Sequence, residues 1–187
     1  MIRAFIAVPL PEALRREVSA IQTNLRTAAS DIRWVDPANL HLTLKFLGSI
    51  EEEPLARLKE ALQAAVRPIS PFIFQLEGVG TFPRTSQPRV VWLGVSQGKE
   101  KLVEVAGVVE KTCVELGLPA QDRSFSPHLT LGRIQSKRKL EQLLERIKSV
   151  QLRRPPLAHA RTLILFQSTL TPEGPVYNPL GEIQLGK

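Results

Sequence analysis

The pattern of apolar and polar residues predicts a chain of strands and helices. Alternating or continuously apolar runs predict strands, and apolar residues three and four positions apart predict helices. The expected strands are 2–8, 32–35, 40–47, 72–79, 89–95, a strand that starts near residue 128, 158–168 and 177–185. The expected helices are 11–28, 51–66, 99–116 and 137–149. Loops are expected at 80–88 and 169–176, because both segments are rich in Pro, Gly and Thr.

Two of the expected strands begin with the same four residues. Residues 41–44 and residues 128–131 both read His-Leu-Thr-Leu, and two of the three histidines in the chain open these copies. Side chains alternate between the two faces of a strand, so His and Thr share one face while the leucines anchor the other. Two half-buried strands could share a sequence by chance. The repeated polar positions, however, have no packing reason to match.

The order of elements indicates an internal duplication. Strand, helix, tetrapeptide strand, helix and strand follow one another in each half, and the two histidines are 87 positions apart. We therefore expect an α+β fold of two repeated units, approximately 1–88 and 89–187, that pack with approximate two-fold symmetry in one domain. Such packing would bring His41 and His128 together in a shared cleft.

Composition limits the possible partners and cellular locations. The formal charge of +7 favours an anionic partner, with nucleic acid ahead of a membrane. No apolar run is long enough to span a membrane, and the N-terminal apolar run is too short for a signal peptide. The single cysteine, Cys113, excludes an internal disulfide and a cysteine-based zinc site. We expect Cys113 to be a buried thiol on a helix, and the protein to be cytoplasmic.

The repeated residues suit chemistry at phosphorus. One imidazole can take a proton from a nucleophile while a second gives a proton to the leaving oxygen. The hydroxyls of Thr43 and Thr130 can donate hydrogen bonds to the non-bridging oxygens of the phosphate. No His, Asp and Glu cluster has metal-ligand spacing, and no Gly-rich phosphate loop is present, so we expect neither a metal nor a nucleotide cofactor.

These motifs resemble those of a known superfamily. The segments His-Leu-Thr-Leu-Lys-Phe-Leu-Gly at 41–48 and Ser-Pro-His-Leu-Thr-Leu-Gly-Arg at 126–133 are similar to the two signatures of the two-histidine phosphoesterases. The segments 80–94 and 174–177 resemble the bacterial and archaeal branch, the RNA 2′,3′-cyclic phosphodiesterases, also called 2′-5′ RNA ligases. The likeness covers nearly the whole chain.

The resemblance implies a fold and a reaction. The fold would be bilobal, with an antiparallel sheet backed by helices in each lobe and the histidines in the central cleft. The reaction would be metal-independent hydrolysis of RNA 2′,3′-cyclic phosphate ends to 2′-phosphates by a monomer. His41 would be the general acid on the leaving O3′, and His128 the general base on water.

Two further residues follow from the resemblance. Phe46 would stack on the base and Arg133 would contact phosphate. Both lie five positions after their histidine, so strict alternation places them on the opposite face, and a bulge or a strand end must turn them into the cleft. Core packing is the alternative role for Phe46, and a surface cation the alternative for Arg133.

Other functions remain open on the sequence. The chain could be a non-catalytic domain that binds RNA ends, although binding alone does not need two imidazoles. It could act on a small cyclic nucleotide, or run the reverse reaction, 2′-5′ ligation, with the same groups. Two residues, His159 and Tyr177, receive no role, although Tyr177 could line the cleft.

Overall fold

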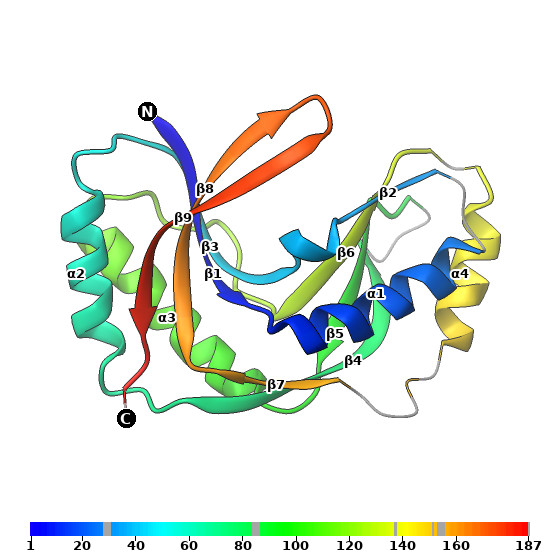
Figure 1. Ribbon diagram of the computed structural model, residues 1–187, viewed down its shortest axis with the longest axis horizontal. Coiled ribbons are helices and arrows are strands. Elements are labelled where there is room, and N and C mark those ends of the chain that lie inside the picture. Colours follow the sequence, from blue (N-terminus) through cyan, green and yellow to red (C-terminus); the bar gives the residue numbers. More distant parts are fainter. Residues whose placement is uncertain (28–30, 84–86, 137, 151, 153–155, 187) are drawn as a thin grey trace.

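A computed structural model describes residues 1–27, 31–83, 87–136, 138–150, 152 and 156–186, which form two sheets and five helices (Figure 1). The strands are β1 (Ile2–Pro9), β2 (Ile32–Trp34), β3 (His41–Ile50), β4 (Phe72–Phe82), β5 (Val90–Val95), β6 (His128–Ile134), β7 (Leu157–Ala160), β8 (Thr162–Thr171) and β9 (Gly174–Gln184). The α-helices are α1 (Glu12–Arg26), α2 (Leu55–Val66), α3 (Lys99–Glu115) and α4 (Leu140–Ser149), and η1 (Pro37–Asn39) is a 3-10 turn.

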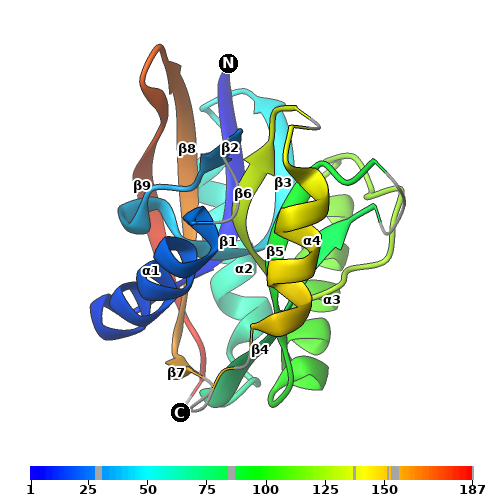
Figure 2. The same ribbon diagram turned by 90° about the vertical axis from the view of Figure 1, so that its right-hand side faces the viewer.

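The two sheets form two lobes. One sheet has the strand order β3-β1-β8-β9 and the other has the order β2-β6-β5-β4-β7, with antiparallel pairing throughout. Helices α2 and α3 pack against the first sheet, and α1 and α4 lie on the side of the second (Figures 1 and 2). The predicted bilobal α+β fold is therefore confirmed.

Each sheet takes strands from both halves of the sequence. Strands β8 and β9, from the end of the chain, complete the sheet that β1 and β3 begin. In the other sheet, β2 and β4 from the first half join β5, β6 and β7. Each strand that begins with a tetrapeptide pairs with the first strand of its own half, β3 with β1 and β6 with β5. The proposed repeats, 1–88 and 89–187, are thus interleaved rather than each forming one lobe.

The buried stripe of each helix follows the predicted spacing. In α1, Leu14, Val18, Ile21 and Leu25 are buried, as the helical period requires. The predicted helix end at residue 28 and helix start at residue 137 lie outside the described residues. Cys113 is fully buried on α3, as predicted, and burial raises the pKa of its thiol to about 11.

Several expected segments differ from the structure, and the helix expected at 51–66 begins only at Leu55. The loop expected at 169–176 is a β-hairpin, because β8 runs to Thr171 and β9 starts at Gly174. The loop expected at 80–88 starts later, since β4 continues to Phe82. The strand expected at 158–168 is two strands, and the chain passes from one sheet to the other at Arg161. In the described part of the chain, no helix is long and apolar enough to cross a membrane.

Candidate active site

A cavity of about 670 Å³ lies between the two sheets. Strands β1, β3, β8 and β9 contribute to its wall from one lobe, and β2 and β6 from the other. Five of the six predicted site residues line it: His41, Thr43, Phe46, Thr130 and Arg133. His128 is not among the lining residues, but it lies two positions before Thr130 on β6, on the same face of the strand.

The two histidines are held in the same way. His41 Nδ1 lies 2.7 Å from the carbonyl oxygen of Asn39, and His128 Nδ1 lies 2.7 Å from that of Ser126. A carbonyl oxygen only accepts hydrogen bonds, so Nδ1 carries the hydrogen in each ring. The Nε2 atom of each neutral imidazole is then left as a proton acceptor, and that of each imidazolium as a donor.

A bulge lies at the last residue of each tetrapeptide. Between β1 and β3, Ile6 pairs with Lys45 and Ala7 with Thr43, so that Leu44 is the extra residue. The same register shift occurs between β5 and β6, where Leu131 is the extra residue. Two consecutive buried residues therefore follow each threonine, and the alternation of faces is inverted after them.

The bulges place the fifth residue after each histidine on the face of that histidine. Phe46 is 65% exposed and lines the cavity, which argues against core filling. Arg133 is exposed and lines it as well. The sequence analysis predicted that a bulge or a strand end must turn Phe46 and Arg133 into the cleft, and the structure shows a bulge in each strand.

Aromatic rings surround His41. Phe5 stacks on the imidazole with ring centroids 4.7 Å apart, and Tyr177 meets it edge-on at 5.3 Å. The ring centroid of Phe166 lies 6.2 Å from that of His41. Desolvation by this burial lowers the pKa of His41, and the hydrogen bond to the Asn39 carbonyl opposes that effect only in part. The neutral imidazole is thus favoured in the free protein.

Sequence reasoning missed two of these rings. Phe5 and Phe166 lie on paired positions of β1 and β8, and their ring centroids are 5.2 Å apart. The alternation of β1 places Phe5 on the opposite face from Ala4 and Ile6, which could have indicated its position. Both faces of the strand are buried, however, so alternation alone could not show which face lines the cavity. Tyr177, which received no role, both lines the cavity and contacts His41.

The start of β9 is connected to the same histidine through Asn39. The side-chain amide of Asn39 donates a hydrogen bond of 2.9 Å to the carbonyl of Pro175. The carbonyl of Asn39 itself accepts from His41. One residue therefore fixes both the ring of His41 and the β8–β9 hairpin that carries Tyr177.

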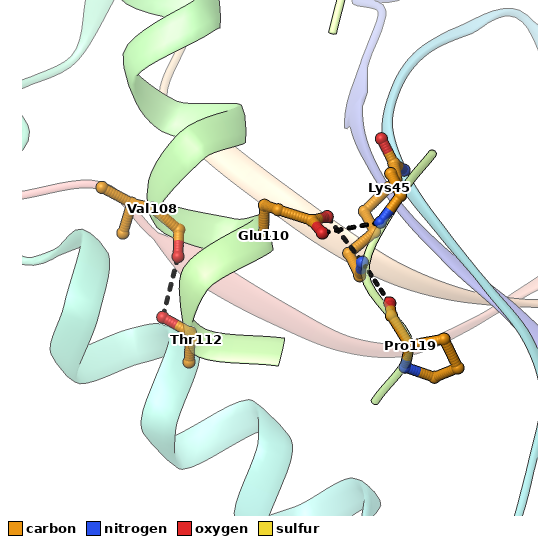
Figure 3. Close-up of polar contacts among 6 residues, drawn as sticks. Lys45, Val108, Glu110, Thr112 and Pro119 are labelled. Atoms are coloured by element: carbon orange, nitrogen blue, oxygen red, sulfur yellow. Dashed lines mark hydrogen bonds and ion pairs between the residues drawn. The ribbon is translucent and has the colours of Figure 1, made fainter. Parts of the chain in front are cut away.

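An ion pair between a buried lysine and a partly exposed glutamate connects β3 with α3 (Figure 3). Lys45, in the first bulge, is 1% exposed, and its Nζ lies 2.5 Å from Glu110 Oε2 on α3 and 2.9 Å from the carbonyl of Pro119. Glu110 also accepts a hydrogen bond of 2.8 Å from the backbone N–H of Gln121. The strand of His41 is thereby joined to the segment that leads to His128.

The ion pair sets the protonation state of Glu110. Partial burial acts to raise the pKa of its carboxyl, but the hydrogen bonds from Lys45 and Gln121 and the charge of Lys45 together hold that pKa below its ordinary value. The carboxyl of Glu110 is therefore ionised at neutral pH. No feature of the sequence alone indicated this pair.

The described residues contain no group of three or more His, Cys, Asp or Glu side chains arranged to hold a metal ion. The arrangement that they do contain is two imidazoles with free Nε2 atoms, two threonine hydroxyls and an arginine, on the strands at the cavity. Such a set can transfer two protons and bind an anion without a Lewis acid.

Comparison with known proteins gives matches along the whole chain. The family model described as LigT like Phosphoesterase matches residues 8–92 and again residues 93–177. The RNA 2′,3′-cyclic phosphodiesterase of Methanothermobacter thermautotrophicus is 36% identical over 184 residues, which is 98% of this chain and 99% of that protein. The protein of the same name from Archaeoglobus fulgidus is 38% identical over 96% of this chain and 98% of its own length.

Solved structures show the same fold. TT0787 of Thermus thermophilus superposes with a TM-score of 0.80 at 30% sequence identity and covers all of both chains. Escherichia coli LigT complexed with 3′-AMP gives a TM-score of 0.74 at 26% identity over 100% of this chain and 99% of that chain. Each of the two segments matched by the family model contains one His-Leu-Thr-Leu tetrapeptide.

Proposed function

The chain belongs to the LigT-like phosphoesterase family, and on this premise we propose that it is an RNA 2′,3′-cyclic phosphodiesterase. The observation that carries the proposal is the matched pair of imidazoles. Both are oriented through Nδ1 by the carbonyl two residues earlier, and both keep Nε2 for proton transfer. Relatives that carry this name match over nearly their whole length.

The proposed reaction is in-line displacement at phosphorus. His128 Nε2 takes a proton from water as the water oxygen bonds to phosphorus. His41 Nε2 gives its proton to O3′ as the P–O3′ bond breaks, which leaves a 2′-phosphate and a 3′-hydroxyl. The hydroxyls of Thr43 and Thr130 donate hydrogen bonds to the non-bridging oxygens, and Arg133 balances their charge. Phe46, exposed on the cavity wall, stacks on the terminal base.

The role of His41 as an acid needs the substrate. Burial favours its neutral form in the free protein, whereas a general acid must start protonated. An anionic phosphodiester bound beside the ring favours the imidazolium. We therefore infer that substrate binding and protonation of His41 are coupled. A ribose 5′-hydroxyl in the place of water would give 2′-5′ ligation with the same groups.

The test of the activity is product mapping without metal. RNA that ends in a 2′,3′-cyclic phosphate is incubated with the protein in EDTA, and the position of the product phosphate is determined. We expect hydrolysis to a 2′-phosphate. A 3′-phosphate product would reverse the identity of the leaving oxygen, and turnover that only Mg²⁺ or Mn²⁺ restores would require a metal mechanism.

Single substitutions separate catalysis from binding. His41→Ala and His128→Ala each remove one proton transfer, so we expect turnover to fall by about 10²–10⁴-fold while affinity for the RNA end changes by less than roughly tenfold. The double variant should lose little more than either single variant, because the two groups act together. His159→Ala, exposed on β7, is the matched control and should keep wild-type turnover. Wild-type turnover in the double variant would show that both tetrapeptides are structural.

Oligomeric state and location remain predictions. A monomer is expected, and size-exclusion chromatography with light scattering would measure it. The cytoplasm is expected because the one cysteine is buried and carries no disulfide.

A further inference from the structure

The cavity extends well beyond the predicted catalytic residues. It continues from His41 and Thr43 to β2, where Arg33 lines it, and to the β8–β9 hairpin, where Leu170 and Val176 line it. A cavity of about 670 Å³ exceeds what one cyclic phosphate and its ribose would fill. This further part of the cavity wall is basic at Arg33 and apolar at Leu170 and Val176.

Two arginines lie side by side at this extension. Arg33 on β2 and Arg133 on β6 are directly opposite each other in the antiparallel register, so their side chains share one face. Both are exposed, and both line the cavity. Like charges directly opposite each other on a sheet are destabilising. An anion between or beside the two guanidinium groups would remove that repulsion.

The arginines on the cavity wall have no acidic partner in the described chain. Arg3, Arg33 and Arg133 form no ion pair with any described residue. The acids on the wall are Asp36, whose carboxylate accepts the N–H of Ala38 at 2.8 Å, and Glu173 at the exposed hairpin turn. The wall therefore carries more positive charge than the single negative charge of the scissile phosphate would neutralise.

The guanidinium of Arg33 reaches the other lobe. Its Nη2 lies 3.5 Å from the position that a Cβ would take on Gly174, at the turn of the β8–β9 hairpin. The same hairpin exposes Leu170 (65%) and Val176 (46%), two apolar side chains on the wall of the cavity. A cation beside exposed apolar groups fits a phosphate that is attached to a nucleoside better than it fits a free inorganic ion.

We propose that Arg33 forms a second anion subsite, which binds the phosphate on O5′ of the terminal nucleotide of the RNA substrate. The proposal rests on the proposed function, because it assumes that the terminal 2′,3′-cyclic phosphate occupies the histidine site. Arg133 then contacts the scissile phosphate and its neighbour Arg33 the next phosphate along the strand. The planar guanidinium matches two phosphate oxygens at once. The subsite makes Arg33 a specificity-determining residue that favours RNA ends over small cyclic nucleosides.

The test compares four substrates that differ only on the 5′ side. They are a nucleoside 2′,3′-cyclic phosphate, the same compound with a 5′-phosphate, a dinucleotide with a natural phosphodiester, and that dinucleotide with a neutral methylphosphonate linkage. For the wild-type protein we expect kcat/KM to be about tenfold higher for the two charged extensions than for the nucleoside. The neutral linkage should lose that gain.

Arg33→Gln identifies the group responsible. This variant should lose about tenfold in kcat/KM on the two charged extensions, and it should no longer distinguish the phosphodiester from the methylphosphonate. Arg57→Gln, which removes an exposed arginine from α2 away from the cavity, is the matched control and should behave as the wild type. A gain for the dinucleotide that is absent for the 5′-phosphate would point to the hairpin leucine and valine as the main contact, and would overturn the assignment to phosphate.

Two other outcomes contradict the proposal. The subsite does not exist if the wild-type protein hydrolyses both dinucleotides equally well, or if Arg33→Gln slows all four substrates alike. If the wild-type protein hydrolyses none of them, the proposed function fails. Calorimetry then tests the subsite by itself, with a 2′-phosphorylated dinucleotide in both linkages, and the charged linkage should bind about tenfold more tightly only when Arg33 is present.

Discussion

The imidazole of His41 contacts the rings of Phe5 and Tyr177, which also contact each other, and its Nδ1 donates to the carbonyl of Asn39. The aromatic contacts remove water from the ring and penalise its charged form, while the carbonyl supports that form less strongly. The chemistry that we propose for His41 needs the charged form. In the proposed mechanism, His41 therefore takes up its proton when the substrate binds.

The protonation of His41 can be followed by NMR titration of its ring nitrogens. We expect its pKa to lie below 6.5 in the free protein and to rise when a nucleoside 2′-phosphate, the product, is bound. His159, exposed on β7, is the control, and its signals should not respond to the ligand. A His41 that titrates above 6.5 without ligand would contradict the effect of burial.

The same shift has a consequence for stability. The unfolded chain binds a proton at this ring with a pKa of about 6.5, and the folded chain binds it more weakly. The free energy of unfolding should therefore decrease as the pH falls from about 6.5 through the lower pKa of the folded state. The contribution is fully present above that window.

Single positions show where sequence reasoning ends. The alternation of the tetrapeptides placed His41, Thr43, His128 and Thr130 on open strand faces, because alternation is a local property of a strand. Phe5 could not be assigned to the cavity in this way. Its place depends on the pairing of β1 with β8, about 160 residues further along the chain, which alternation does not encode.

Among the elements, one ion pair, between Lys45 and Glu110, links β3 and α3 beside the segment before β6. Lys45 is almost completely buried, whereas Glu110 keeps about a third of its side chain exposed (30%). Water can therefore solvate the Glu110 carboxylate if Lys45 is lost, but it can hardly reach the Lys45 ammonium group if Glu110 is lost. Loss of Glu110 leaves a charge in the interior, and loss of Lys45 leaves a charge that water can reach.

We expect Glu110→Gln to lower the free energy of unfolding by about 3 kcal/mol, and Lys45→Met to lower it by less. Urea denaturation would measure both. Glu104→Gln, which breaks an exposed Lys101–Glu104 pair of 2.8 Å on the same helix, is the control and should cost under about 0.5 kcal/mol. Equal losses for Glu104→Gln and Glu110→Gln would show that burial of Lys45 has no energetic weight.

The ends of helices and strands were predictable where the sequence pattern of apolar and turn-forming residues changed, and not where that pattern continued. Helix α3 was expected at 99–116 and spans Lys99–Glu115, because Gly117, whose φ is +83°, ends it. The strand expected at 158–168 contains no Gly or Pro to mark the change of sheet, which shows only as a shift in the alternation of buried residues between Ala160 and Leu163. The β8–β9 hairpin was missed because it projects from the body of the molecule and has few buried positions (Figure 1).

For the whole molecule, the interleaving of the two halves decides whether either can fold alone. A fragment 1–88 would keep the β3–β1 pair without β8, and its β2 and β4, which do not pair with each other, would have lost all their neighbours, so every strand would have an open edge. We expect neither 1–88 nor 89–187 to unfold cooperatively alone, and circular dichroism during denaturation would measure this. The full chain should unfold in one transition. A cooperative transition in either fragment would show that the repeats are independent units.

The position of β1 also matters while the chain is being made. Strand β1 leaves the ribosome well before one of its two neighbours, β8, which begins at residue 162. At the 5–20 residues per second typical of translation, roughly 8–30 s separate the synthesis of the two strands. During that interval one edge of β1, the strand that carries Phe5, has no partner from its own chain and is available to chaperones or to other nascent copies.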